Sequence, residues 1–181
     1  SGESRKNTIL LQLNRERDAE IGDEGYHLSV TASGISITAN RPSGVFYGLQ
    51  TLLQLLPPDI ESTQRVQQSS WHVPAVKITD YPRFGWRGLM LDVSRHFFTK
   101  EEVERYIDEM VKYKYNVFHW HLSDDNGWRI EIKSLPELTK IGAWRVPRTG
   151  RFGQFEPPQP GEAATDGGFY TQEDIKEIVK Y

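Results

Sequence analysis

The sequence contains no cysteine, which excludes a disulfide framework and any thiolate chemistry. It has no apolar run as long as a membrane-spanning helix requires, so we expect no membrane span. Basic residues do not gather in runs and the net charge is −3, which argues against nucleic acid as the main partner. The opening letters, SGESRKNT, lack the apolar segment of a signal peptide. We therefore expect that any signal peptide has been removed or never existed. The sequence does not determine the cellular compartment, and we favour export to the periplasm or the outside of a bacterial-type cell.

The first part of the chain predicts a small α+β domain. Apolar and polar residues alternate in three short segments, which indicates half-buried strands. These segments cover residues 9–13, 26–30 and 35–37. Gly34 falls between the second and third segments, so we expect these two strands to form a hairpin. From Ser43 the apolar spacing becomes that of a helix, which Pro57 ends. We expect this domain to span residues 1–80.

A different pattern begins at Trp86. The segment Gly88–Val93 is almost entirely apolar, which predicts a strand buried on both faces and therefore a parallel sheet. Thr99 followed by Glu102 is a capping box, after which apolar residues recur at helical spacing. The next strand is expected at Asn116–Leu122. Together these elements predict a β-α-β unit with a right-handed crossover.

A long segment, residues 123–170, separates this unit from the next helix, which Thr171 and Asp174 are expected to cap. Connections of this length are commonly functional. Within it we expect a short helix at Leu135–Ile141. The stretch 147–168 is rich in Gly and Pro, which favours mobility.

These elements predict an α/β fold in which a small α+β lead domain precedes two β/α units. A (β/α)8 barrel of the TIM type needs eight units and roughly 250 residues, whereas residues 81–181 supply two. We therefore expect this part to be the start of an incomplete TIM-type barrel, and the chain to be part of a longer protein. The unclosed barrel edges favour self-association.

Ionisable residues cluster at the ends of the two barrel-like strands. The clusters are Asp92, Arg95 and His96, and His119, His121, Asp124 and Asp125. The carboxyl ends of the strands build the ligand site in a β/α barrel, so both clusters are candidates for a polar site. Two interpretations of Arg95 stay open. It either forms a structural ion pair with Asp92 or presents its forked guanidinium to hydroxyls or a carboxylate of a ligand.

His119 and His121 lie two positions apart on a strand and therefore point the same way. With Asp124 and Asp125 they imitate a set of metal ligands, but no matching ligands occur elsewhere in the sequence, so we expect no metal ion. We interpret them as polar residues inside the barrel, with His121 and Asp125 as candidate pocket residues. Adjacent residues in an extended chain point apart, so Asp124 and Asp125 are not expected to act as a matched acid–base pair.

Two segments, RGLMLDVSRHF and KYNVFHWHLSDDNGWRIEIKSLPELTKIGAWR, closely resemble the opening of the catalytic barrel of glycoside hydrolase family 20, the β-N-acetylhexosaminidases. Upstream, RPSGVFYGLQTLLQLLP and VPAVKITDYPRFGWRG resemble the end of that family's small α/β domain and its junction with the barrel. The resemblance covers most of the chain. It implies that residues 1–80 form the small non-catalytic domain and that residues 81–181 begin the catalytic barrel.

The resemblance also implies roles for single residues. Arg95, in SRHF, matches the family's arginine that binds outer hydroxyls of the terminal, non-reducing sugar. Asp124 matches an aspartate that supports the catalytic acid through a histidine, which is expected outside this sequence. In this family the 2-acetamido carbonyl attacks the anomeric carbon, while an Asp-Glu pair orients that group and supplies the general acid. The implied partner is an oligosaccharide or glycan that contains N-acetylhexosamine, and no cofactor is implied.

The family's Asp-Glu pair normally follows a later strand in a Gly-x-Asp-Glu context, which this sequence does not contain. We therefore expect no catalytic residue in this chain and no hexosaminidase activity from it alone. Two alternatives from other classes stay open. One is a non-catalytic carbohydrate-binding or interaction module that has kept barrel-like segments. The other is a metal-dependent hydrolase that uses His119, His121 and Asp124.

Overall fold

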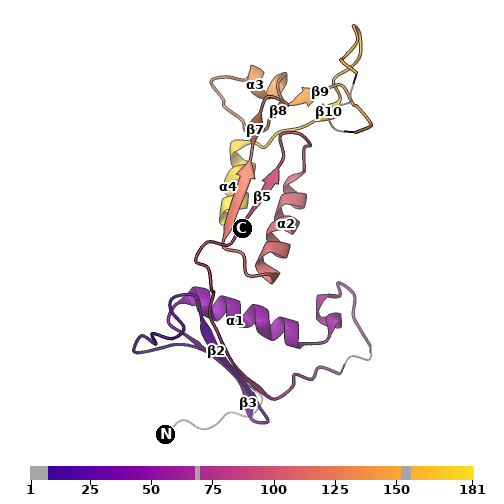
Figure 1. Cartoon of the computed structure of the whole chain (residues 1–181). Coiled ribbons are helices and arrows are strands. Elements are labelled where there is room, and N and C mark those ends of the chain that lie inside the picture. Colours follow the sequence, from indigo (N-terminus) through magenta and orange to yellow (C-terminus); the bar gives the residue numbers. More distant parts are fainter. Residues whose placement is uncertain (1–7, 68–69, 152–155) are drawn as a thin grey trace. The chain divides into compact units, whose positions relative to one another are not determined.

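The computed structural model describes residues 8–67, 70–151 and 156–181. Residues 1–7, which hold most of the opening segment SGESRKNT, lie outside these ranges, and so do residues 152–155 of the Gly- and Pro-rich stretch. The chain divides into two compact units, Ser1–Gly85 and Trp86–Tyr181 (Figure 1). Each unit has its own hydrophobic core and is described by itself.

The first unit is a four-stranded sheet with a helix against it. Its strands are β1 (Thr8–Leu13), β2 (Tyr26–Thr31), β3 (Gly34–Ala39) and β4 (Val76–Asp80), in the order β1-β3-β2-β4. β2 pairs antiparallel with β3 and β4, which confirms the predicted hairpin, whereas β1 runs parallel to β3. Helix α1 (Pro42–Leu55) follows β3, and the short 3-10 helix η1 (Pro58–Glu61) follows α1.

Helix α1 packs closely on β2 and β3. The core beneath it consists of Tyr26, Leu28, Val30, Ile37, Ala39, Tyr47 and Leu52. Gly48 permits this approach, because a Cβ atom there would lie only 2.6 Å from Cγ2 of Ile37. The buried Tyr26 hydroxyl donates to Oδ2 of Asp80 at 2.7 Å and lies 2.6 Å from Oγ1 of Thr51. This hydroxyl joins β2, β4 and α1.

The strand expected at residues 9–13 is present, but the prediction that it is half-buried is wrong. Ile9, Leu11 and Leu13 are 57%, 47% and 47% exposed. β1 is an edge strand of the sheet, and the core under α1 includes none of its residues. The alternating pattern thus predicted the strand, while its position at the edge of the sheet determined its exposure.

The second unit contains two parallel strands, β5 (Gly88–Asp92) and β6 (Val117–His121), connected by helix α2 (Lys100–Lys112). All three elements lie where the sequence predicts them. The capping box is confirmed, because the Thr99 side chain accepts from the Glu102 N–H while the Glu102 carboxylate accepts from the Thr99 N–H at 2.7 Å. The register places Asp92 beside His121.

The prediction that residues 88–93 are buried on both faces is wrong. One face of the β5–β6 sheet contributes Leu91, Phe118 and Trp120 to a core with α2 and the last helix (Figure 1). On the other face, Met90 is 53% exposed and its neighbour in the register, His119, is exposed as well. The exposure of both residues shows that this face of the two-stranded sheet is open to solvent within the described part of the chain.

The long connection after β6 is built from short elements. These are the hairpin β7 (Ser123–Asp124) and β8 (Gly127–Trp128), helix α3 (Glu137–Lys140), and the paired strands β9 (Trp144–Arg145) and β10 (Asp166–Gly167). α3 confirms the expected short helix. Helix α4 (Gln172–Lys180) then begins at the predicted capping box of Thr171 and Asp174. None of the helices that the structure describes is long and apolar enough to span a membrane.

Candidate functional site

The two clusters of ionisable residues meet at the carboxyl ends of β5 and β6. Nη1 of Arg95 lies 2.8 Å from Oδ2 of Asp92 and 2.9 Å from Oδ2 of Asp124. Nε2 of His121 lies 3.0 Å from the same oxygen of Asp124. These four side chains, here called the strand-tip cluster, are between 26% and 33% exposed. The cluster is therefore largely covered by protein but still in contact with solvent.

Asp92 shapes the turn that carries Arg95. Its Oδ1 atom accepts from the N–H of Ser94 at 2.9 Å and from the N–H of Arg95 at 3.3 Å. An aspartate that accepts from backbone two residues further on folds the chain into a tight turn. Its Oδ2 atom meanwhile accepts from the Arg95 guanidinium. The ion pair with Asp92, which was one of the two open interpretations of Arg95, is therefore present.

The β7–β8 hairpin supplies the other half of the cluster. Oδ1 of Asp124 accepts from the N–H of Asp125 at 2.8 Å, which leaves Oδ2 to face Arg95 and His121. Nε of Arg95 donates to Oδ1 of Asn126 at 3.2 Å, a contact that the sequence did not suggest. Within the described residues, Nη2 of Arg95 makes no hydrogen bond. This nitrogen is therefore the part of the guanidinium that can donate to a ligand.

Electrostatics keep the two carboxylates charged. Burial raises the pKa of Asp92, but the hydrogen bonds it accepts from Arg95 and Ser94 outweigh burial and bring the pKa below its ordinary value of 3.8. The pKa of Asp124 is lowered first by the hydrogen bond from the Asp125 backbone and also by the charge of Arg95. The hydrogen bond to Asp92 in turn raises the pKa of Arg95. At neutral pH the cluster therefore holds two carboxylates around one guanidinium.

The remaining candidate residues lie differently. Asp125 is exposed, and it is its backbone N–H that takes part in the cluster. The ring of His119 stacks on that of His121 with centroids 6.2 Å apart. Nδ1 of His96 lies 3.2 Å from Nη2 of Arg145. In the ranges that the structure covers, no three His, Asp or Glu side chains are arranged to hold a metal ion, so the metal-dependent alternative has no ligand set there.

The sequence interpretation missed Arg129. This residue is 1% exposed, and its guanidinium donates to the backbone carbonyls of Val93, Ser94, Ala143 and Gly168. Alternation of Trp128, Ile130 and Ile132 put Arg129 on the opposite side of the chain, where a charged residue is normally solvated. No local signal shows that residues 143 and 168 cover that side.

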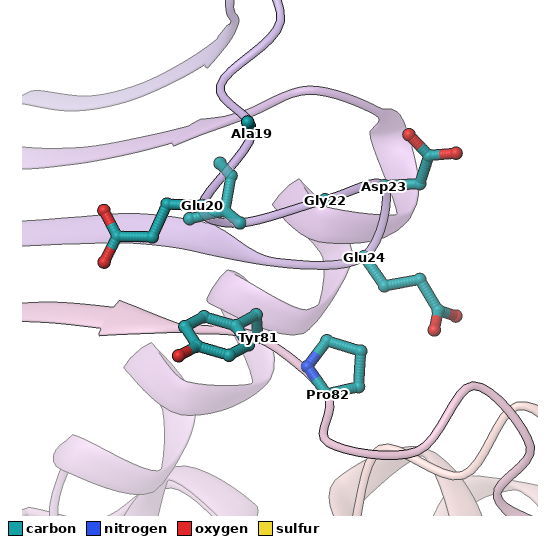
Figure 2. A pocket seen from close by; sticks show the side chains of 8 residues that line it. Ala19, Glu20, Gly22, Asp23, Glu24, Tyr81 and Pro82 are labelled. Atoms are coloured by element: carbon teal, nitrogen blue, oxygen red, sulfur yellow. The ribbon is translucent and has the colours of Figure 1, made fainter.

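A separate cavity of about 230 Å³ lies in the first unit (Figure 2). Its lining consists of residues 19–24 together with Tyr81 and Pro82. Figure 2 shows the carboxylates of Glu20 and Asp23 directed away from one another, and Asp23 pairs with Arg17 at 2.8 Å. None of the candidate site residues that the sequence indicated line this cavity.

Almost the whole chain matches one family. Residues 84–181 match the catalytic domain of glycosyl hydrolase family 20, and residues 1–81 match domain 2 of the same family. The chain belongs to glycosyl hydrolase family 20. Its family 20 relatives include a beta-hexosaminidase from Porphyromonas gingivalis, 45% identical over 88% of this chain and 19% of the relative. A beta-hexosaminidase from Vibrio furnissii is 48% identical over 88% of this chain and 24% of the relative.

Solved structures agree with this assignment. The chain is similar to the N-acetyl-beta-hexosaminidase of Streptomyces plicatus in complex with Thio-NAglucal, with a TM-score of 0.79 and 45% identity over 96% of this chain and 31% of that one. The chain is also similar to the family 20 beta-N-acetylhexosaminidase of Streptomyces coelicolor A3(2), with a TM-score of 0.80 and 43% identity over 97% of this chain and 32% of that one. This family 20 chain thus spans about a fifth to a third of the proteins that it matches.

Proposed function

We propose that this family 20 chain is part of a β-N-acetylhexosaminidase. The parent protein hydrolyses terminal, non-reducing N-acetylglucosamine or N-acetylgalactosamine by substrate-assisted, retaining catalysis. The observation that carries this proposal is the 2.9 Å contact between Arg95 and Asp124 at the ends of two parallel strands. We assign sugar binding to Arg95 and support of the catalytic acid to Asp124. The relatives that carry the name beta-hexosaminidase support it.

Arg95 is the substrate-binding residue of this proposal. Asp92, Asp124 and Asn126 hold its Nη1 and Nε atoms, so the guanidinium is already oriented before a ligand arrives. The two N–H groups on Nη2 are then available to neighbouring hydroxyls of a sugar, for which the planar fork is well suited. Preorientation lowers the entropy that binding must overcome.

Asp124 has the supporting role. It orients Arg95 through Oδ2 and contacts His121 through the same atom. In the parent enzyme we expect it also to accept from a histidine that supports the catalytic acid. His121, which contacts Asp124, and the exposed Asp125 are the residues that we expect to line the pocket of the complete site.

The 181-residue chain by itself is expected to be inactive. Neither of its two Asp-Glu steps belongs to the strand-tip cluster: one is residues 23–24 in the first unit, and the other is residues 108–109 on the exposed side of α2. Asp108 there accepts from the Tyr181 hydroxyl, and Glu109 from Lys112. A general acid contributes roughly a hundredfold to ten-thousandfold in rate, and a preorganised electrostatic site adds more.

We also propose the domain arrangement that the resemblance implies. Residues 1–80 form the small non-catalytic domain, and residues 81–181 form the start of the TIM-type barrel. The unclosed sheet of β5 and β6, with Met90 exposed on one face, would then favour self-association. Sedimentation velocity over a range of concentrations tests this, because a monomer at every concentration contradicts it.

A turnover assay tests the functional proposal. The purified 181-residue chain is incubated with a chromogenic N-acetylglucosaminide, and the longer polypeptide encoded by the same reading frame is incubated in parallel. We expect release of the chromophore by the longer polypeptide alone. Turnover by the 181-residue chain would contradict its inactivity, and a longer polypeptide that is inactive on both N-acetylglucosaminide and N-acetylgalactosaminide would contradict the proposed function.

A further inference from the structure

Arg129 is the one charged residue among the described residues that is buried. It is almost completely buried, and no carboxylate lies within ion-pair distance of it in the part of the chain that the structure describes. Burial lowers the pKa of its guanidinium. Backbone carbonyls stabilise the charge instead, with Nε donating to Val93 at 2.9 Å, Nη2 to Ser94 at 2.8 Å and Nη1 to Gly168 at 3.1 Å and to Ala143.

Two of these four carbonyls belong to the residues directly before Arg95. We propose that Arg129 is a positioning residue, which holds the carbonyls of Val93 and Ser94 and so fixes the direction in which the Arg95 side chain leaves the end of β5. The proposal deepens the proposed function and rests on it, because Arg95 is the residue assigned to the sugar.

The turn before Arg95 is held from two sides. The Asp92 carboxylate accepts from the N–H groups of Ser94 and Arg95, whereas Arg129 donates to the carbonyls of Val93 and Ser94. The buried Ser94 hydroxyl also donates to the carbonyl of Gly127 at 2.8 Å. This bond ties the turn to the β7–β8 hairpin, which carries Asp124. Rotation of the turn would therefore break contacts on both sides at once.

The planar guanidinium fits this task better than an ammonium group. It has five N–H donors in a fixed plane, whereas lysine has three donors on a flexible stem. Gly127 provides the space, because a Cβ atom there would lie 2.7 Å from Nη2 of Arg129 and 2.7 Å from the Ser94 carbonyl. A substitution of Gly127 therefore disturbs the same contacts while it leaves Arg129 in the chain.

The test measures how accessible Arg95 is to a reagent that modifies arginine. The 181-residue chain, R129K and G127A are treated with phenylglyoxal, and the rate at Arg95 is divided by the rate at the 74% exposed Arg105 in the same sample. Both variants disturb the hydrogen bonds from the charged Arg129 guanidinium to the carbonyls of Val93 and Ser94, which hold the turn before Arg95. We therefore expect this ratio to rise about tenfold in R129K and in G127A. The exposed Arg151 supplies the matched control, R151K, in which the ratio stays unchanged.

Hydrogen–deuterium exchange distinguishes positioning from general stability. We expect faster exchange around residues 93–97 in R129K, with unchanged protection in α2 and α4. An unchanged Arg95 ratio in a folded R129K or a folded G127A overturns the proposal. Loss of protection in α2 and α4 in both variants also overturns it, because Arg129 would then serve stability alone. If R129K unfolds and G127A stays folded, the Arg95 ratio in G127A decides whether the proposal holds.

The same experiment separates this proposal from the proposed function. Added N-acetylglucosamine is expected to slow modification of Arg95 in the unsubstituted chain. If the sugar has no effect, the role of Arg95 in sugar binding fails. The comparison of R129K with the unsubstituted chain still reports whether Arg129 positions Arg95, because that comparison uses no sugar.

Discussion

Asp92 and His121 stand side by side in the register of β5 and β6. Arg95 contacts Asp92, and Asp124 contacts His121; the two partners are three positions apart in the sequence in both pairs. Two turns that leave adjacent strands at the same level therefore deliver a guanidinium and a carboxylate to one place. The strand-tip cluster is a consequence of parallel pairing in this register.

Replacement of Arg95 by methionine is expected to weaken binding of N-acetylglucosamine by about tenfold or more, since hydrogen bonds from a charged donor are lost. It also leaves Asp92 and Asp124 as neighbouring carboxylates without the cation between them. A ligand-observed NMR titration of the 181-residue chain measures the affinity. Arg105→Met, at an exposed position on α2, is the matched control. Equal affinities for the two variants would contradict the role of Arg95.

Stability of the second unit is expected to fall in acid. The pKa of Asp174 lies below its ordinary value of 3.8, first because the Thr171 side chain donates to it. A carboxylate whose pKa is lower in the folded than in the unfolded chain stabilises the fold at pH values above the unfolded pKa. This contribution is lost as the pH falls through the folded pKa. Urea unfolding should show a decline below about pH 4 that is smaller in Asp174→Asn.

The control for this pH dependence is Glu173→Gln, at a side chain that is 70% exposed on the same helix. It should keep the decline of the unsubstituted chain. The assignment to Asp174 is refuted if Asp174→Asn loses stability in acid as steeply as the control.

Substitution of Thr99 by alanine is expected to lower the free energy of unfolding of the second unit by about 1 kcal/mol. The threonine side chain is the N-cap of α2, and the variant leaves the Glu102 N–H without that acceptor. Chemical denaturation measures the difference. Thr149→Ala, in an exposed loop of the same unit, should change the free energy far less, and equal effects would show that the capping box does not stabilise the helix.

Removal of the Tyr170 hydroxyl is expected to cost about 1–2 kcal/mol. The side chain is 1% exposed, and its hydroxyl donates to the carbonyl of Phe98, which would lose its partner. Thermal and urea unfolding of Tyr170→Phe measure the effect. Tyr113→Phe removes a hydroxyl from a residue that is 74% exposed, and stability should not change there. If Tyr170→Phe is equally neutral, the hydrogen bond contributes nothing.

Local signals predicted the elements well. The capping boxes that begin α2 and α4 require only a side chain and a backbone N–H within one turn, so the residues themselves specify the contact. The turn after Asp92 follows the same logic, because a short acidic side chain reaches the backbone two residues further on. The hairpin of β2 and β3 was indicated by Gly34 between two alternating segments.

Burial and long-range contacts could not be predicted in this way. β1 and Met90 look like core positions from their neighbours in the chain, but one lies at the edge of a sheet and the other on a face that is open to solvent within the described part of the chain. Asn126 shows the same limit, because its contact with Arg95 depends on how two separate turns approach each other.

By itself, the sequence determined the hairpin strands, the two parallel strands and the residues that end them, the helices α1, α2 and α4, and the family to which the chain belongs. Only the tertiary structure decided that Arg129 lies inside the protein and that Arg95 faces Asp124. The physical reason is range. Caps and turns are satisfied within a few residues, whereas a buried guanidinium is stable only where segments distant in the chain bring their carbonyls to it.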